Sequence, residues 1–197
     1  VGVKVLDCLG KGTVASVVEG IHWVRDNADY EHSIVNMSLG GPISPAVDEA
    51  TNELGALMPV VVAAGNEGQP ACNVSPARAN NAITVGSFNY YGMRSWFSNW
   101  GDCVDIWAPG SNVDGRMKDG TSVQASGTSA AAPLVTSVIA ALAARNGVST
   151  MEAAQIMFNE SSNLPIIDGR CPARCVVLWL REEPYAWLRS DSPSWRR

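Results

Sequence analysis

Residues 127–133, Gly-Thr-Ser-Ala-Ala-Ala-Pro, decide the fold class, because a turn of small residues leads directly into a long apolar segment. The pattern from Ser129 to Arg145 is helical, and residues 130–144 contain no charge and nothing larger than leucine. We therefore expect a helix that is buried on all sides. Pro133 lies near the end of the first turn, where its missing N–H costs at most one helical bond.

A serine in the first turn of such a helix has two interpretations. Free backbone N–H groups and the positive end of the helix dipole surround Ser129, which suits a nucleophile whose substrate develops an oxyanion. Alternatively, Thr128 or Ser129 is an ordinary N-cap in front of a tight alanine interface. The stretch taken alone does not separate the two interpretations.

A second motif favours the nucleophile. Ala-Ala-Gly-Asn at residues 63–66 precedes Gly-Thr-Ser-x-Ala-x-Pro, and together they resemble the subtilisin-like serine peptidases, especially the proteinase K-like branch. The resemblance covers roughly residues 1–160, with several motifs in the family's order. It implies an α/β fold of three layers, in which helices flank a mostly parallel sheet, here as a partial domain.

The composition sets outer limits on partners. The 197 residues are 46% hydrophobic, which suits one domain, and the net charge of −5 with no basic cluster in the main body excludes a nucleic-acid partner. The longest apolar run, residues 56–64, is too short to cross a membrane. We expect a monomer without a membrane partner. Since Val1 stands inside a strand-like run, we interpret the chain as a piece of a longer precursor.

The remaining periodicity predicts alternating strands and helices. Residues 1–6 are expected to form a buried parallel strand. Further strands are expected at residues 33–39, 60–64, 82–88, 104–107 and 122–126, and helices at residues 13–27, 44–58 and 150–159.

The resemblance assigns roles to two polar residues. Ser129 is expected to attack the peptide carbonyl, while Asn66 donates its side-chain amide to the oxyanion together with the Ser129 N–H. The amide is neutral, so its hydrogen bond strengthens as charge develops without a counter-ion. On its own, Asn66 in Gly-Asn-Glu-Gly would be interpreted as a turn residue that tolerates positive φ.

The resemblance also implies a cleft for an extended peptide, bound by main-chain hydrogen bonds. One wall is the loop of residues 10–13, the other is the segment after the strand at residues 33–39, and small residues form the floor of the specificity pocket. The implied cleft residues are Gly10, Gly12, Ser38, Leu39, Gly40, Ala63, Ala64 and Gly65.

The family's catalytic base and acid are missing from this sequence. His22 and His32 are the only histidines, and neither stands in the expected His-Gly-Thr-like context. Asp7 precedes Cys-Leu and is interpreted as structural. In family order the catalytic aspartate and histidine come before the matched region, and so do strands of the sheet, one of them interior. We therefore expect the chain alone to be inactive.

The five cysteines cannot all pair internally, and the resemblance implies a Cys72–Cys103 disulfide. Cys8 matches a family half-cystine whose partner lies upstream of residue 1. The resemblance further implies a calcium site at Asp105 with the carbonyls of Asn80 and Ala82, since calcium prefers oxygen ligands. A salt-bridged or capping Asp105 explains the motif equally well. No cofactor is expected for the chemistry.

We therefore interpret residues 1–162 as the C-terminal part of a subtilisin-like catalytic domain and residues 163–197 as a divergent tail. The expected function is serine endopeptidase activity of a secreted parent protein that acts on protein or peptide substrates and carries an N-terminal pro-region. The alternative is a degenerate relative that binds extended peptides without cutting them. The tail's Cys171 and Cys175 lack the further ligands of a zinc site.

Overall fold

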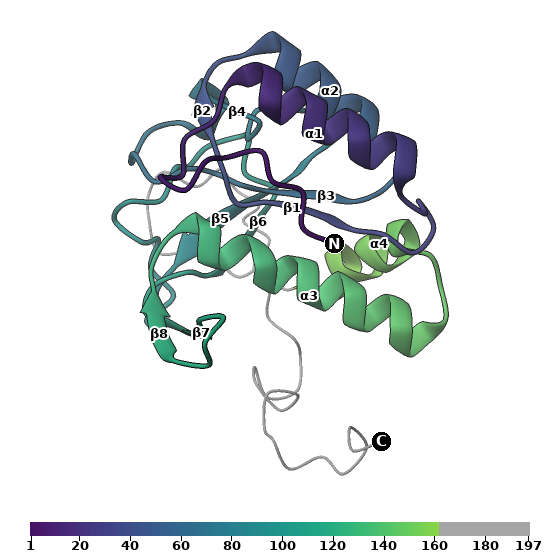
Figure 1. Ribbon diagram of the computed structural model, residues 1–197. Helices are drawn as coiled ribbons and strands as arrows, with labels where there is room; N and C mark the ends of the chain where they lie inside the picture. The colour runs from purple at the N-terminus through teal and green to yellow at the C-terminus, as the bar shows by residue number, and fades with distance from the viewer. Residues whose placement is uncertain (162–197) are drawn as a thin grey trace.

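The computed structural model describes residues 1–161, which fold around a parallel four-stranded sheet with the strand order β1-β3-β5-β6 (Figure 1). The strands are β1 (Val35–Met37), β3 (Val60–Ala63), β5 (Ile83–Phe88) and β6 (Ile106–Pro109). All three neighbouring pairs are parallel, with Val35 opposite Val60 and Val85 opposite Ile106.

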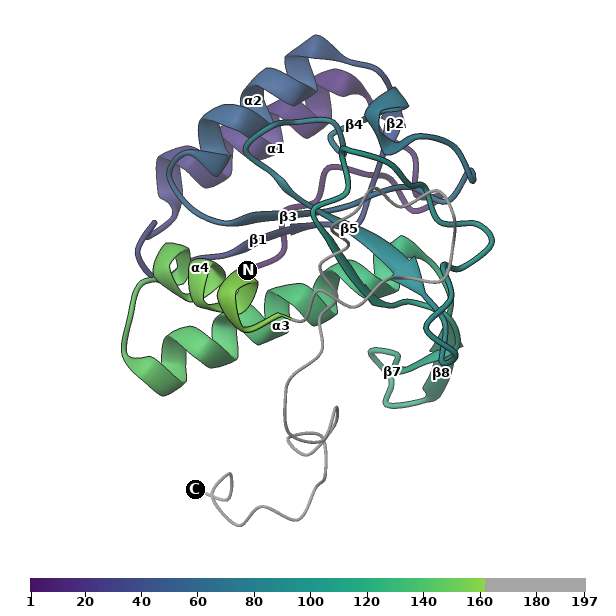
Figure 2. The same ribbon diagram turned by 180° about the vertical axis from the view of Figure 1, so that it is seen from behind.

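Two helices cover each face of the sheet, which gives the three layers seen from opposite sides in Figures 1 and 2. One pair is α1 (Val14–Asn27) with α2 (Pro45–Gly55), and the other is α3 (Thr128–Asn146) with α4 (Thr150–Glu160). Because side chains alternate along a strand, β3 serves both layers. Val60 and Val62 pack with α1 and α2, whereas Val61 packs with α3 and α4.

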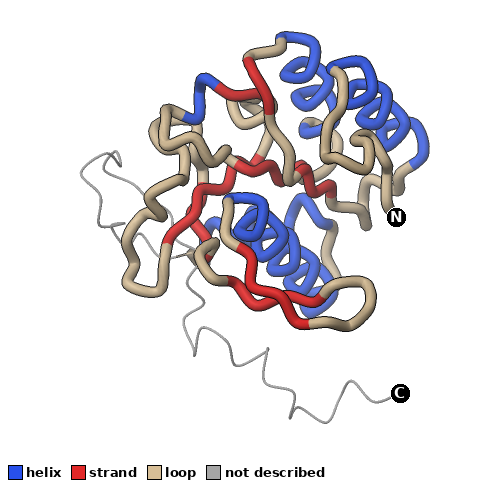
Figure 3. Tube along the Cα trace, turned by 60° about the vertical axis from the view of Figure 1, so that its left-hand side comes forward, coloured by secondary structure: helices blue, strands red, loops and turns tan. Residues whose placement is uncertain are grey.

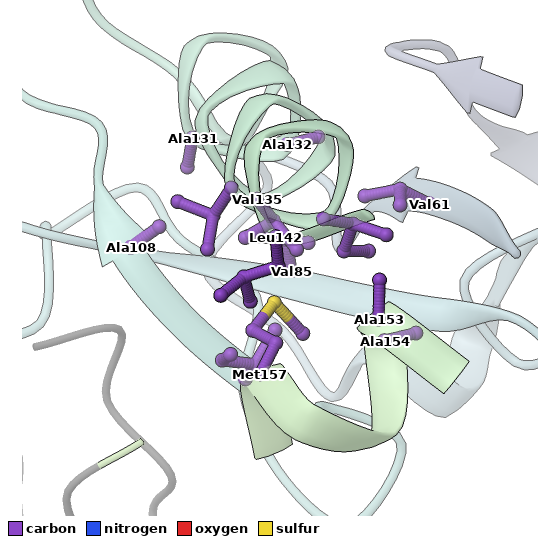
Figure 4. Packing of buried hydrophobic residues seen from close by; sticks show 13 residues of the cluster. Val61, Val85, Ala108, Ala131, Ala132, Val135, Leu142, Ala153, Ala154 and Met157 are labelled. Atoms are coloured by element: carbon purple, nitrogen blue, oxygen red, sulfur yellow. The ribbon is translucent and has the colours of Figure 1, made fainter. Parts of the chain in front are cut away.

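Small side chains let α3 lie close to the sheet (Figure 4). Its residues Ala131, Val135 and Leu142 pack against Val61 and Val85, and Met157 of α4 fills the space beside them. The chain enters α3 from Gly127 and leaves it at Gly147, whose φ of 64° forms a left-handed C-cap. By length and composition α3 resembles a membrane span. Its face that carries Ala131, Val135 and Leu142, however, packs in the core of the domain.

Two small antiparallel ladders complete the described chain. The strand β2 (Gly41–Pro42), which follows β1 in the chain, pairs with β4 (Val74–Ser75). The 3-10 turn η1 (Ala71–Asn73) leads directly into β4. The strands β7 (Val113–Arg116) and β8 (Ser122–Ala125) form a projecting hairpin that leads into α3 (Figure 3).

Three predictions about local structure are wrong. Residues 1–6 form no strand, and residues 1–4 are exposed, because no neighbouring strand pairs with them in the described chain. The helix α3 is not buried on all sides, since Pro133, Ser137 and Ala140 are exposed on its outer face. The strand expected at residues 104–107 begins two residues later, at Ile106. The helices expected at residues 13–27 and 150–159 are confirmed, and Thr13 caps α1 through a capping box with Ser16.

Candidate active site

Ser129 lies where the carboxyl end of β1 meets the first turn of α3. The Ser129 hydroxyl is exposed and donates to the carbonyl of Ser38 at 3.4 Å, and the Ser38 hydroxyl donates to the Ser129 carbonyl at 3.0 Å. In an uninterrupted helix that carbonyl would accept the N–H of residue 133, but Pro133 has none. The Ser38 hydroxyl therefore supplies the missing donor and ties α3 to β1.

Thr128 orients the side chain of Asn66. The Asn66 Oδ1 accepts the Thr128 N–H at 2.8 Å and the Thr128 hydroxyl at 3.0 Å, while the same hydroxyl accepts the Gly65 N–H at 3.2 Å. With Oδ1 held by two donors, the Asn66 amide nitrogen points away from them. It has no acceptor within the described chain, and the same is true of the Ser129 N–H.

These two unpaired donors converge beside Gly127. A Cβ built on Gly127 would stand 3.6 Å from both the Asn66 Nδ2 and the Ser129 N, so the two nitrogens face a common space. The φ of 152° at Gly127 is a backbone conformation that side-chain-bearing residues rarely adopt. Glycine thus permits the turn and leaves the space between the donors open. We call residues 65–66 and 127–129 the catalytic turn.

Asn99 holds the loop of residues 64–69 that carries Asn66, a role that its sequence context did not predict. Its side chain is fully buried, donates from Nδ2 to the Ala64 carbonyl at 2.9 Å and accepts at Oδ1 from the N–H groups of Glu67 and Gln69. These bonds hold the loop on both sides of Asn66. The Phe-Ser-Asn motif at residues 97–99 was visible in the sequence, but its contacts with residues thirty or more positions earlier were not.

The remaining cleft residues fall into two groups. Ala63 and Ala64 are buried where β3 ends, and Gly65 follows with a φ of 102°. A Cβ at Gly65 would collide with the Asn99 side chain, so only glycine fits there. On the other wall, Ser38 and Gly40 are exposed and Leu39 is half-buried in the segment that leads into β2.

Asp7 shapes the loop of residues 10–13, which is the wall of the cleft opposite Ser38 and Gly40. Its Oδ1 accepts the N–H groups of Leu9 and Lys11 at 2.8 and 2.9 Å, which agrees with the structural role expected for this aspartate. Gly10 has a φ of 73°, and a Cβ at Gly12 would come within 2.6 Å of the Val5 carbonyl oxygen. Both glycines are therefore required by the backbone of this loop.

Neither histidine is placed to activate Ser129. His22 lies on α1, in the helical layer opposite α3. His32 lies before β1, at the end of the strand remote from Ser38, and its Nδ1 contacts the Asp29 carboxylate at 2.9 Å. This hydrogen bond raises the pKa of His32 and lowers that of Asp29.

Asp105 is the carboxylate that the resemblance assigns to a calcium site. Its Oδ2 accepts the Thr84 N–H at 2.8 Å, two residues after Ala82. The residue as a whole is exposed, but the surrounding chain desolvates the carboxylate and raises its pKa to about 6, an effect that the Thr84 N–H opposes. Within residues 1–161 no three acidic, histidine or cysteine side chains cluster as metal ligands, so the other ligands would be carbonyls and waters.

The predicted disulfide between Cys72 and Cys103 is confirmed, with their Cα atoms 5.3 Å apart. Cys103 packs with Ala64, Ala71 and Val74, directly behind the end of β3. Cys8 is exposed and free. Cys171 and Cys175 lie outside the described residues.

Comparisons with known proteins identify the family of the chain. A sequence model described as the Subtilase family matches residues 1–171. Alkaline serine exoprotease A of Vibrio alginolyticus is 41% identical over 172 residues, which are 86% of this chain and 32% of that protein. The extracellular serine proteinase of Thermus sp. (strain Rt41A) is 44% identical over 70% of this chain and 34% of its own length. The chain thus spans a third of these relatives.

A solved structure extends the comparison to three dimensions. The crystal structure of a cold adapted subtilisin-like serine proteinase superposes with a TM-score of 0.83 at 38% sequence identity. The superposition covers 91% of this chain but 66% of the other. The α/β fold expected from the sequence is therefore confirmed, and about a third of the relative's chain has no counterpart here.

Proposed function

This chain belongs to the subtilase family, and from that membership we propose that it carries the nucleophile and the oxyanion site of a serine endopeptidase. The parent protein would cleave protein or peptide substrates, outside the cell as one relative's name indicates. The observation that carries the proposal is the convergence of the Asn66 amide nitrogen and the Ser129 N–H on one space beside the Ser129 hydroxyl.

In the proposed chemistry this chain supplies the nucleophile and the oxyanion donors, and the rest of the parent protein supplies the base. The Ser129 oxygen attacks the substrate carbonyl carbon, and the carbonyl oxygen becomes an oxyanion that accepts from Asn66 and the Ser129 N–H. The proton of Ser129 needs a basic acceptor. In this chain the hydroxyl donates to the Ser38 carbonyl, which is too weak a base to take the proton. We expect the family's histidine, oriented by its aspartate, to replace that carbonyl in the parent protein.

Labelling of the intact parent with a fluorophosphonate tests this assignment. The reagent should modify Ser129 and no other serine, because only this hydroxyl combines a base with an oxyanion site. Ser129→Ala should abolish labelling. Ser137→Ala is the matched control on the same helix, since the Ser137 hydroxyl only donates to the Pro133 carbonyl, and labelling should persist. Modification of another serine with Ser129 untouched would mean that the site is misassigned.

The binding-only alternative makes the opposite prediction in the same experiment. A degenerate relative would still bind an extended peptide through the cleft residues, but its Ser129 would react no faster than an exposed serine such as Ser137. The proposed pro-region would be a further ligand of this cleft, and a stoichiometric inhibition of the parent by its own N-terminal segment would reveal it.

We further propose that calcium, when present, is held by Asp105 with the carbonyls of Asn80 and Ala82. A divalent cation would favour the charged form of this desolvated carboxylate. A chelator should lower the melting temperature of the parent protein, and Asp105→Asn should remove this dependence. Equal chelator sensitivity in the variant would place the ion elsewhere.

A further inference from the structure

Two residues of α3, one before and one after Pro133, are joined to polar side chains at the end of β1. The Ser129 carbonyl, which lacks its helical donor because residue 133 is proline, accepts from the Ser38 hydroxyl at 3.0 Å. After the proline, the Thr136 hydroxyl lies 3.1 Å from the Asn36 Oδ1. The two attachment points therefore enclose the position at which the helical ladder is interrupted.

A third hydrogen bond connects these two contacts. The Asn36 Nδ2 donates to the Ser38 Oγ at 3.0 Å. A continuous chain of hydrogen bonds thus runs from Thr136 through Asn36 and Ser38 to the Ser129 carbonyl. We call the side chains of Asn36, Ser38 and Thr136 the β1–α3 bridge.

The sequence spacing of the bridge residues matches both elements. Asn36 and Ser38 both turn toward α3, whereas Met37 between them is buried with α1 and α2, as the alternation along a strand requires. Ser129 and Thr136 are seven residues apart, which is close to two turns of a helix, so they lie on the same face of α3. Each element therefore presents its two bridge positions to the other.

The hydrogen bonds of the bridge all run in one direction. The Thr136 hydroxyl has one proton and two acceptors within reach, the Asn36 Oδ1 at 3.1 Å and the Ala132 carbonyl at 3.2 Å. In a helix the Ala132 carbonyl already accepts the N–H of residue 136, whereas the Asn36 Oδ1 has no other donor within residues 1–161. The proton therefore favours Asn36. Each bond then polarises the next one, toward the Ser129 carbonyl.

The end point of the bridge is the residue that carries the proposed chemistry. Ser129 supplies both the attacking oxygen and one of the two oxyanion donors, and its carbonyl is the backbone group that Pro133 leaves without a helical partner. Helices bend most readily at proline, and a bend here would move the hydroxyl and the N–H together. A displacement of about 1 Å costs about 10²-fold in rate, so the donor to this carbonyl matters for the reaction.

We propose that Asn36 and Thr136 are positioning residues for Ser129, because they orient the Ser38 hydroxyl that holds the Ser129 carbonyl beside Pro133. The inference rests on the proposed function, since it concerns the reactivity of Ser129. Neither residue belongs to the cleft residues assigned above. Their loss should therefore lower turnover and leave KM unchanged.

The test measures turnover, KM and the rate of fluorophosphonate labelling in the intact parent. Thr136→Val keeps the branched shape but removes the hydroxyl, so turnover and labelling should both fall about three- to tenfold, with KM unchanged. Thr136→Ser should restore both rates. Ser137→Ala is the matched control on the next residue, because the Ser137 hydroxyl only donates to the Pro133 carbonyl, and it should leave both rates unchanged.

A double substitution tests whether Thr136 acts through Asn36. Asn36→Ala removes two bonds of the bridge and should lower turnover about tenfold. Once Asn36 is absent, Thr136 has no route to Ser38, so adding Thr136→Val should lower turnover less than about twofold further. Independent effects on the stability of α3 and β1 would instead multiply.

Three outcomes would overturn the inference alone, in a parent whose unaltered Ser129 reacts with the reagent. They are labelling of Thr136→Val at the unaltered rate, equal impairment by serine and valine at position 136, and full multiplication of the two effects in the double variant. An unaltered parent whose Ser129 does not react would overturn the proposed function and this inference together.

Discussion

The catalytic turn and the groove between residues 1–6 and β1, here called the edge groove, both expose unpaired hydrogen-bonding groups, but they arrange them differently. In the catalytic turn two donors, the Asn66 Nδ2 and the Ser129 N–H, point at one space, and the nearby Asn66 Oδ1 and Ser129 carbonyl already accept from other groups. In the edge groove the unpaired groups follow one another along β1 and residues 1–6. Converging donors suit a single developing charge, whereas a row of donors and acceptors suits another strand.

The two regions also differ in what completes them. The catalytic turn joins segments 62 residues apart, and Thr128 and Asn66 both belong to this chain. At the edge groove residues 1–4 are exposed, and within the described residues β1 pairs with a strand on one side only. The chain therefore places the proposed oxyanion site, whose donors are already oriented, beside a free edge of the sheet, and the following experiments perturb one region at a time.

The largest expected effect is on catalysis by the chain alone. Without a histidine near Ser129, peptide hydrolysis should be about 10⁶-fold slower than in the parent, since in subtilisin, from which this magnitude is taken, loss of the base costs about 2 × 10⁶ in turnover. The measurement compares the chain, the chain mixed with its upstream segment, and the parent on one peptide substrate. Rapid cleavage by the chain alone, abolished by His22→Ala or His32→Ala, would contradict this prediction.

Removal of the disulfide should destabilise the region behind the catalytic turn and should not affect the edge groove directly. Cys72→Ser together with Cys103→Ser should lower the free energy of unfolding by about 3–4 kcal/mol, because the bond closes a loop with a sequence separation of 31. Denaturant titration under oxidising conditions gives the value. Cys8→Ser is the control and should have little effect. Non-reducing peptide maps showing free Cys72 and Cys103 in secreted protein would refute the assignment.

Asn66→Ala in the parent should lower turnover by about 10²–10³ with little change in KM. This range is the one found for the equivalent donor in subtilisin and is not calculated from this structure. The reason is that the amide bond to the oxyanion forms only in the transition state. Asn52→Ala is a surface control outside the catalytic turn. A change confined to KM would indicate that Asn66 binds substrate instead of the oxyanion.

Thr128→Val should have a smaller effect of the same kind. Valine keeps the branched shape but removes the hydroxyl that donates to Asn66 and accepts from Gly65. Loss of one such hydrogen bond is worth about 1 kcal/mol, so turnover should fall about five- to tenfold. Thr128→Ser should restore most of the activity. If serine and valine are equally impaired, packing of the methyl group and not the orientation of Asn66 determines the effect.

The sequence predicted the regions that depend on local pattern. The apolar strand β3, the helix α1 and the turn of small residues before α3 were all predictable from residue type and spacing. The conformation of residues 1–6 was not predictable in this way, because a β-branched run forms a strand only if a partner strand exists. The support by Asn99 was also missed, since it depends on a contact between segments that are distant in the sequence.

The smallest expected effect is electrostatic and lies beside the edge groove. His32 and Asp29 are both exposed and line that groove, and Glu31 adds a weaker attraction. The raised pKa of His32 means that the pair stabilises the fold fully below about pH 6.5 and loses this contribution as the pH rises through the raised value. The lowered pKa of Asp29 means that the contribution is also lost in acid, as the pH falls through that lowered value, so the stabilisation is greatest between about pH 4 and 6.5.

Nuclear magnetic resonance titration of the His32 imidazole measures this pair directly. Asp29→Asn should move the His32 pKa downward, whereas Asp26→Asn, which removes the partner of Arg25, should not. An unchanged His32 pKa in Asp29→Asn would mean that the Asp29 carboxylate, 2.9 Å from the His32 Nδ1, does not cause the shift.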